Sequence, residues 1–299
     1  MNKLAVLLLG LLPFSAVAQI PQSDPVVLLV EENHSYESVI GNPGMPFLND
    51  LAKKYSLATE YYADTHPSIG NYFMLTAGQI ITNDDSFDRV LQVDNLVRQF
   101  IATKKSWKAY AQSLPKPGYV GPNRGPYLKR HNPSAYFAEV VNDPTQRQNL
   151  VPFPQLAEDL KAGRLPNFIY IVPDAQNDAH DCPSSKYFCR DQEKLVAADE
   201  WLASNLPPLL ESPAFKRNGL LIVVFDESYA NDKRHGGGRI PVVLVGPRVK
   251  HAYRSTKFYQ HASTLRLICD RLGLGHCPGA ESDASRMDEF FQVSTTAKH

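Results

Sequence analysis

Four short segments of the chain are apolar at almost every position: 25–33 (PVVLLVEEN), 168–174 (FIYIVPD), 220–228 (LLIVVFDES) and 240–247 (IPVVLVGP). Such continuous aliphatic runs are typical of strands that are buried on both faces of a mostly parallel sheet. Segments with helical periodicity alternate with them, at 45–55, 94–104, 193–206 and 261–274. This alternation predicts an α/β fold with a mostly parallel central sheet, flanked by helices on both faces.

Polar side chains follow these runs at the point where each predicted strand ends. Glu32 and Asn33 follow the first run, and Asp226 and Glu227 follow the third. In open α/β sheets, binding sites form beyond the carboxyl ends of the strands, so these residues are expected to meet there. Buried carboxylates cost desolvation energy unless a cation or hydrogen bonds compensate. The oxygen ligands favour one divalent cation, Mg²⁺, Ca²⁺ or Mn²⁺, and Zn²⁺ stays open.

Ser68 stands at the start of another apolar segment, in DTHPSIGNYFMLTAG (64–78). One explanation is structural, because serine is a preferred N-cap of helices. The other is chemical, because a hydroxyl beside a dication can become a nucleophile and can itself be a metal ligand. Asn71, one helical turn later, either donates an amide N–H to a phosphoryl oxygen or buttresses the loop. Both pairs of alternatives remain open at this stage.

The N-terminal segment MNKLAVLLLGLLPFSAVAQ predicts a signal peptide over residues 1–18, with an uncleaved anchor as the alternative. We therefore expect a periplasmic or secreted protein without a stable membrane anchor. The chain has 31 basic and 31 acidic residues, and removal of the signal's one lysine leaves a net charge of −1. This balance gives no electrostatic argument for nucleic acid as a partner.

The four cysteines form two close pairs, Cys182 with Cys189 and Cys269 with Cys277. In an exported protein this spacing favours two short disulfides, and a four-thiolate zinc site is the less suitable alternative. Neither repeats nor linker-like segments interrupt the chain. We therefore predict one domain over 20–292 and a disordered tail over 293–299.

Eight stretches in order resemble a phosphoesterase family of the alkaline phosphatase superfamily, which includes acid phosphatases and non-haemolytic phospholipases C. They are VEENHSYESVIG (30–41), THPSIGNYFMLTAG (65–78), SWKAYAQSLP (106–115), YLKRHNPSAYF (127–137), FIYIVPDAQNDAHDC (168–182), VVFDE (223–227), GGGRIPVVLVGP (236–247) and FYQHASTLRLICDRLGL (258–274).

The resemblance implies metal-dependent hydrolysis through a phosphoserine, with Ser68 as the nucleophile. By matching position it places Glu32, Asn33, Asp226 and Glu227 on the metal-ligand motifs and His180 on a phosphate-binding motif. Three further histidines are assigned to phosphate or substrate binding: His66, His131 and His261. For His66 a supporting role behind the ligands is equally compatible. His180 stands six residues after Asp174, which departs from the spacing of a second metal site and favours a histidine-lined pocket. His34 is expected to turn away from the site, and His235 to lie on the surface.

The sequence thus predicts an exported acid phosphatase that acts on small phosphomonoesters. A phospholipase C-type phosphodiesterase is the nearest alternative, and a non-catalytic secreted binding protein is a remote one. A serine esterase is disfavoured because the chain contains no Gly-x-Ser-x-Gly motif.

Overall fold

The computed structural model describes residues 22–279 and 284–292. The predicted signal peptide (1–18) and tail (293–299) lie outside the described residues. The strands are β1 (Val26–Glu31), β2 (Ser56–Tyr61), β3 (Trp107–Ala111), β4 (Leu150–Pro152), β5 (Phe168–Val172), β6 (Leu220–Phe225), β7 (Val242–Val245) and β8 (Tyr253–Tyr259). The helices are α1 (Tyr36–Val39), α2 (Pro46–Lys54), α3 (Ile69–Ala77), α4 (Leu96–Thr103), α5 (Ala138–Val141), α6 (Pro144–Arg147), α7 (Gln155–Lys161), α8 (Asp191–Asn205), α9 (Pro207–Leu210), α10 (Pro213–Asn218) and α11 (His261–Leu272).

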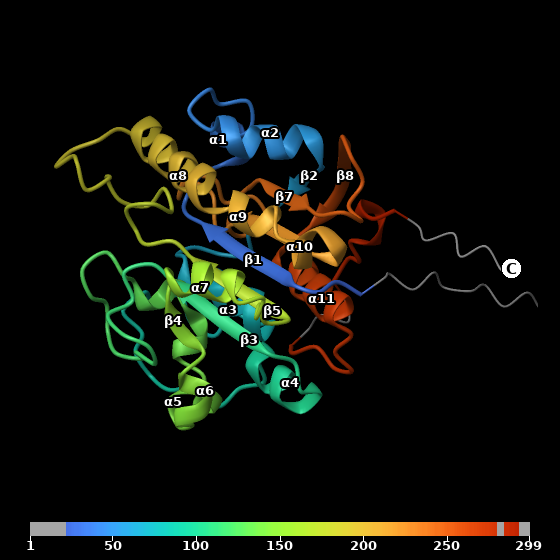
Figure 1. Cartoon of the computed structure of the whole chain (residues 1–299). Helices are drawn as coiled ribbons and strands as arrows, with labels where there is room; N and C mark the ends of the chain where they lie inside the picture. Colours follow the sequence, from blue (N-terminus) through green and yellow to red (C-terminus); the bar gives the residue numbers. More distant parts are fainter. Residues whose placement is uncertain (1–21, 280–283, 293–299) are drawn as a thin grey trace, which may run out of the picture.

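The strands form one eight-stranded sheet in the order β4-β3-β5-β1-β6-β7-β2-β8 (Figure 1). Only β7 runs antiparallel to its neighbours in this sheet, and the other pairs are parallel. The predicted α/β class and mostly parallel sheet are therefore confirmed. The four apolar runs of the sequence correspond to β1, β5, β6 and β7, and the four periodic segments overlap α2, α4, α8 and α11, of which α8 begins two residues earlier than expected.

The central strands are covered on both faces, because every residue of β1, β5 and β6 is buried. Helix α2 packs against α8, and α3 packs against α11. Local signals explain several helix ends. Pro46 begins α2, Asn95 caps α4 by accepting from the Arg98 N–H, and Gly78 ends α3 at φ 67°. None of the described helices combines the length and the apolar character needed to span a bilayer.

The parallel register brings distant segments together at one edge of the sheet. Glu31 in β1 is paired with Phe225 in β6, so Glu32 and Asp226 leave the sheet side by side. The Asp226 N–H donates to the Glu31 carbonyl at 2.8 Å. The Glu32 N–H donates to the Asp178 carbonyl at 2.8 Å, which joins the segment after β5 to the same edge. Residues nearly two hundred positions apart thereby meet at one edge of the sheet.

Candidate functional site

Ser68 precedes α3 and is almost completely buried. Its side chain makes no capping hydrogen bond to the helix. Instead, Asp85 Oδ1 accepts the N–H of Ile69 at 3.1 Å. The Ser68 hydroxyl points to the crevice and donates to Glu32 Oε2 at 3.1 Å. The N-cap explanation for this serine is therefore wrong, since its side chain accepts no helix N–H and an aspartate from another segment accepts the first one.

The predicted ligand residues surround that hydroxyl. Asn33 Oδ1 and Glu227 Oε1 each lie 3.5 Å from Ser68 Oγ, in addition to Glu32 Oε2. Asp226 Oδ1 accepts the backbone N–H of Asn33 at 2.9 Å, which links the two ligand pairs. We call these four residues and Ser68 the oxygen cage. The structure brings all five together.

Each carboxylate of the cage has one oxygen held by a group other than Ser68. Glu32 Oε1 accepts the Tyr72 hydroxyl at 2.5 Å, while Oε2 faces Ser68. Glu227 Oε2 lies 2.8 Å from His66 Nδ1, while Oε1 faces Ser68. Asp226 Oδ1 is held by Asn33, while Oδ2 is buried and has no hydrogen-bond partner among the described residues. A buried carboxylate oxygen without a partner is costly.

The three carboxylates also repel one another. Burial, together with the charge of Glu227, raises the pKa of Asp226 to about 8. Burial and the charges of Asp226 and Asp178 raise the pKa of Glu32 well above its usual range. Burial raises the pKa of Glu227. An all-oxygen set with this charge and an orphaned oxygen fits a hard divalent cation.

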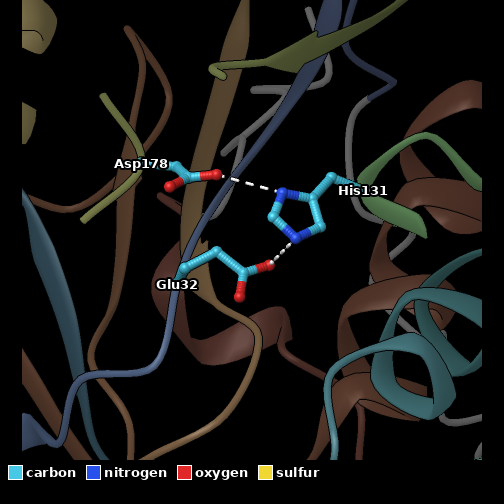
Figure 2. A group of neighbouring side chains, drawn as sticks. All are labelled: Glu32, His131 and Asp178. Atoms are coloured by element: carbon cyan, nitrogen blue, oxygen red, sulfur yellow. Dashed lines mark hydrogen bonds and ion pairs between the residues drawn. The ribbon is translucent and has the colours of Figure 1, made fainter. Parts of the chain in front are cut away.

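His131 lies behind Glu32 and is not directed toward the crevice. Figure 2 shows its ring between two carboxylates, with Nε2 3.0 Å from Glu32 Oε1 and Nδ1 3.0 Å from Asp178 Oδ2. The ring stacks on Tyr72 at 5.2 Å. Burial lowers the pKa of this ring well below its usual value. Both ring nitrogens thus lie beside carboxylates, which indicates a role in supporting Glu32, and the assignment of His131 to phosphate binding stays a prediction.

Glu32, His131 and Asp178 form a second arrangement of metal-binding side chains, with ligand atoms within 4.8 Å of one another. A cation there would have to displace a contact that His131 already makes. The oxygen cage needs no such displacement, since Asp226 Oδ2 is free in it. The cage is therefore the better candidate site for a cation.

Two other histidines hold the cage in place. His66 Nε2 donates to the Asp232 carbonyl at 2.9 Å, and its Nδ1 contacts Glu227. That contact raises the pKa of His66. His261 is fully buried, and its Nε2 donates to the Asp226 carbonyl at 2.6 Å. The second nitrogen of His261, Nδ1, lies 3.3 Å from the Tyr61 hydroxyl. These contacts agree with supporting roles for both residues, and their assignment to phosphate binding stays a prediction.

Asn71 supports the loop that leads to Ser68. Its Oδ1 accepts the N–H groups of Asp64 and Thr65 at 3.0 and 3.1 Å, and its Nδ2 donates to the Thr65 carbonyl at 2.9 Å. The residue is completely buried. The expected amide donor to a phosphoryl oxygen is therefore corrected to the loop-buttressing alternative.

His180 differs from these histidines because 27% of its side chain is exposed. Its Nδ1 lies 2.8 Å from Asp181 Oδ1, and Arg130 Nη2 donates to its Nε2 at 3.1 Å. Arg130 Nε lies 3.8 Å from Asp85 Oδ2, and Asp85 caps the helix beside Ser68. Arg130 and His180 therefore stand near the cage as its cationic and partly exposed side.

Sequence reasoning missed Arg130, Tyr72 and Asp178 as members of the site. Arg130 directly precedes His131 in a quoted motif, but nothing in that spacing shows which side chain faces the crevice. As expected, His34 turns away, with Nδ1 2.9 Å from the Glu32 carbonyl, and His235 lies on the surface.

Both predicted disulfides are confirmed. Cys182 is bonded to Cys189 and Cys269 to Cys277, with Cα–Cα distances of 5.5 and 5.7 Å. No cysteine is free for a thiolate zinc site among the described residues.

Comparisons with known proteins identify the family of the chain. A sequence model of the phosphoesterase family matches residues 42–275. A phosphate-repressible acid phosphatase of Penicillium chrysogenum is 30% identical over 279 residues, which are 88% of this chain and 63% of that protein. A phosphatidylinositol-3-phosphatase of Mycobacterium tuberculosis is 30% identical over 257 residues, covering 85% of this chain and 79% of that protein. The chain therefore spans less than two thirds of the Penicillium relative's length.

The fold also resembles solved structures. A protein of the alkaline phosphatase superfamily from Vibrio parahaemolyticus superposes with a TM-score of 0.60 at 13% identity, over 91% of this chain and 73% of that one. At this identity the likeness concerns the fold alone.

Proposed function

The chain belongs to the phosphoesterase family, and from this premise we propose that it hydrolyses phosphomonoesters with Ser68 as the nucleophile. The observation that carries the proposal is the environment of the Ser68 hydroxyl. It is buried, does not cap its helix, and lies 3.1–3.5 Å from oxygens of three residues at the strand ends. A hydroxyl whose only role was packing would not need this convergence of carboxylates.

A divalent cation would be held by Glu32, Asn33, Asp226 and Glu227 together with Ser68. When bound, it would lower the pKa of the serine hydroxyl and offset charge on the phosphoryl group. The donor set favours Mg²⁺, Ca²⁺ or Mn²⁺, in one site, and does not exclude Zn²⁺.

The remaining chemistry falls to the chain's own side chains. Ser68 Oγ attacks phosphorus, and its proton already points to Glu32 Oε2. The bond from phosphorus to the leaving alcohol breaks, which leaves a phosphoserine that water hydrolyses. Arg130 and His180 bind the phosphoryl oxygens, and His180 supplies the proton of the leaving alcohol once substrate has displaced its contact with Arg130.

The relatives named acid phosphatase and phosphatidylinositol-3-phosphatase support a monoester as the substrate. Comparing the rate of p-nitrophenyl phosphate hydrolysis with the rate of phosphatidylcholine hydrolysis separates this proposal from a phospholipase C-type phosphodiesterase.

We also propose that the protein is exported, to the periplasm or beyond, because two disulfides are typical of oxidising compartments.

The decisive experiment replaces Ser68 by alanine. We expect turnover of p-nitrophenyl phosphate to fall by at least about a thousandfold. After acid quenching during turnover, the wild-type protein should carry covalent phosphate and the variant should not. Ser56→Ala is the matched control, since Ser56 is also a buried serine with a hydroxyl hydrogen bond, to the Lys250 carbonyl, at the far end of β2. A folded Ser68→Ala protein with undiminished turnover would end the serine mechanism.

A further inference from the structure

A carboxylate from outside the oxygen cage connects the nucleophile's helix with the cationic side of the site. Asp85 lies in the segment between α3 and α4, and its side chain is 34% exposed. Its Oδ1 accepts the N–H of Ile69 at 3.1 Å, and its Oδ2 lies 3.8 Å from Arg130 Nε. The two oxygens of one side chain therefore have two different partners, the main chain directly after Ser68 and the guanidinium.

The segment that carries Asp85 is fitted closely to the start of α3. A Cβ atom at Gly70 would overlap Asn83 Oδ1, so the missing side chain at Gly70 leaves room for this segment against the helix. On the other side of Asp85, the Phe87 ring packs edge-to-face on Phe73 of α3, with centroids 6.3 Å apart. These contacts place the carboxylate at the helix start.

The first oxygen of Asp85 fixes the main chain directly after the nucleophile. The first N–H groups of a helix have no partner within the helix, and the Ser68 side chain does not supply one for α3. On the other side of the nucleophile, Asn71 Oδ1 accepts the N–H groups of Asp64 and Thr65. Side-chain oxygens thus hold the main chain before and after Ser68, while the serine hydroxyl stays free of the helix.

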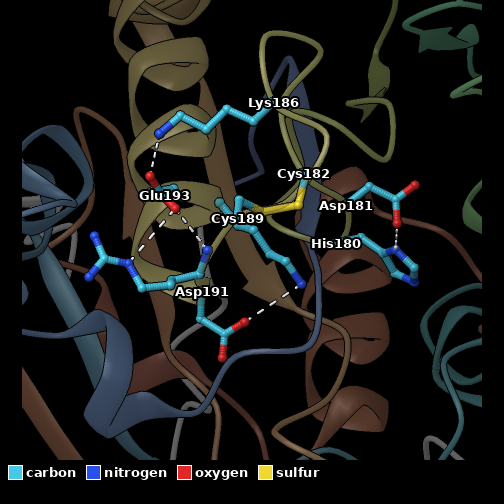
Figure 3. The surroundings of a disulfide bond; sticks show 9 residues. His180, Asp181, Cys182, Lys186, Cys189, Asp191 and Glu193 are labelled. Atoms are coloured by element: carbon cyan, nitrogen blue, oxygen red, sulfur yellow. Dashed lines mark hydrogen bonds and ion pairs between the residues drawn. A yellow bond between two sulfur atoms is a disulfide. The ribbon is translucent and has the colours of Figure 1, made fainter.

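The second oxygen of Asp85 holds the Nε side of Arg130. The side chain of Arg130 is 13% exposed, and Asp85 forms its one ion pair among the described residues. The opposite side of the guanidinium, Nη2, donates to His180 Nε2 at 3.1 Å. His180 Nδ1 in turn contacts Asp181, beside the disulfide of loop 182–189 (Figure 3). The guanidinium is therefore held from two sides.

A carboxylate at this place carries an electrostatic cost. Burial is the largest cause that raises the pKa of Glu227, and the charge of Asp85 also raises it, so Asp85 lies within electrostatic reach of the oxygen cage. The same charge repels a phosphoryl group that approaches Arg130. A negative side chain beside an anion site needs a compensating role. The geometry offers one, because Asp85 keeps the guanidinium and the nucleophile's main chain in a fixed relation.

We propose that Asp85 is a positioning residue for the reaction at Ser68. Its Oδ2 orients Arg130 toward the phosphoryl oxygens, and its Oδ1 fixes the main chain next to the nucleophile. The proposal rests on the function proposed above, in which Arg130 binds phosphate and Ser68 attacks phosphorus. Because each oxygen serves one task, two substitutions separate them: asparagine keeps an oxygen acceptor without the charge, and alanine removes both contacts.

The experiment compares Asp85→Asn and Asp85→Ala with the wild-type full-length protein, each loaded with the same dication. Hydrolysis of p-nitrophenyl phosphate gives kcat and KM, and isothermal titration gives the Kd of inorganic phosphate. For Asp85→Asn we expect KM and this Kd to rise about three- to tenfold, with kcat within about twofold of wild type. For Asp85→Ala we expect the same losses in binding and a fall in kcat of at least about tenfold, because the main chain after Ser68 is no longer fixed.

Asp88→Asn is the matched control, because Asp88 lies on the same segment and forms an ion pair with Lys129, the neighbour of Arg130. It should leave kcat, KM and phosphate binding unchanged. In a double-mutant cycle, Asp85→Asn should cost no further phosphate affinity once Arg130→Gln is present. Urea denaturation of each variant shows that the comparison concerns folded proteins.

Tighter phosphate binding by Asp85→Asn would overturn the proposal, because the carboxylate would then only repel the substrate. Unchanged KM and Kd in this variant, or additive losses in the cycle, would overturn it as well, and so would a folded Asp85→Ala protein with the kcat of wild type. If Asp85→Ala does not fold, the asparagine variant and the cycle decide. Phosphate binding needs no turnover, so its outcome is distinct from failure of the serine mechanism, which covalent phosphate on Ser68 tests.

Discussion

Asp226→Asn is expected to stabilise the metal-free protein and to weaken its cation binding. A buried carboxylate destabilises the metal-free protein, whereas the metal-bound protein needs its negative charge. Asp226 is completely buried, and burial followed by repulsion from Glu227 raises its pKa from 3.8 to about 8. Asparagine keeps an oxygen that accepts the Asn33 N–H, but it carries no charge. The substitution therefore removes the cost of an uncompensated carboxylate and, with it, a cation ligand.

The magnitude follows from proton linkage. At pH 7 the unfolded carboxyl is ionised, while the folded one keeps its proton because its pKa is about 8. Folding must take up that proton across about three pH units, which costs about 4 kcal/mol at 1.36 kcal/mol per unit. The folded state binds more protons than the unfolded state, so stability falls as the pH rises from about 4 toward 8. Because the cage carboxylates share protons, we expect a measured gain of about 2–4 kcal/mol at pH 7, shrinking to about 1–2 kcal/mol at pH 5.

Urea denaturation, followed by far-UV circular dichroism with the disulfides intact, measures this gain in the free energy of unfolding. The measurement is made after dialysis against chelator and again after Mg²⁺, Ca²⁺ or Mn²⁺ has been added back. Asp232→Asn is the control of opposite sign, since the Arg234 guanidinium holds the pKa of Asp232 well below its usual range. That variant should lose stability at pH 7. If Asp226→Asn stabilised the protein equally with and without the dication, no cation would occupy the cage. If it failed to stabilise the metal-free protein at pH 7, the carboxylate would not be under strain from burial.

Three further predictions test the site. Chelation should abolish p-nitrophenyl phosphate hydrolysis, and elemental analysis should find about one divalent ion per active chain; activity that survives complete metal removal would contradict the cage. His131→Asn should lower cation affinity by about 10–100-fold, measured by isothermal titration, because it releases Glu32; unchanged affinity would place His131 outside the site's support. Arg130→Gln should raise KM and weaken inhibition by inorganic phosphate, with Arg124→Gln as an exposed control; an effect on kcat alone would contradict a binding role.

Four strands could be predicted from the sequence because burial on both faces leaves a continuous apolar run. The other four could not. β2 (SLATEY) and β8 (YRSTKFY) include exposed or half-exposed positions near the sheet's edge, where polar residues are tolerated. β3 contains a lysine that pairs with Asp159, and β4 has three residues. Short or polar strands depend on their neighbours more than on their own composition.

The convergence of the ligand residues was predictable for a related reason. Glu32 and Asp226 follow apolar strands, and parallel strands bring their carboxyl ends to one edge. Orientation was not predictable. A histidine in a motif has the same spacing whether its ring faces a substrate or the back of a carboxylate, and only packing decides between the two.

Three of the histidines show what that packing achieves. Each contacts a different cage residue: His131 lies behind Glu32, His66 behind Glu227, and His261 on the main chain of Asp226. A cluster of like charges would otherwise relax outward or take up protons, and both changes would spoil a cation site. His131 and His66 each fix one oxygen of a glutamate and leave the other facing Ser68, while His261 fixes the main chain of Asp226. Substitution of any of these histidines should therefore first change how tightly the cage holds its ion, and affect substrate binding only through that loss.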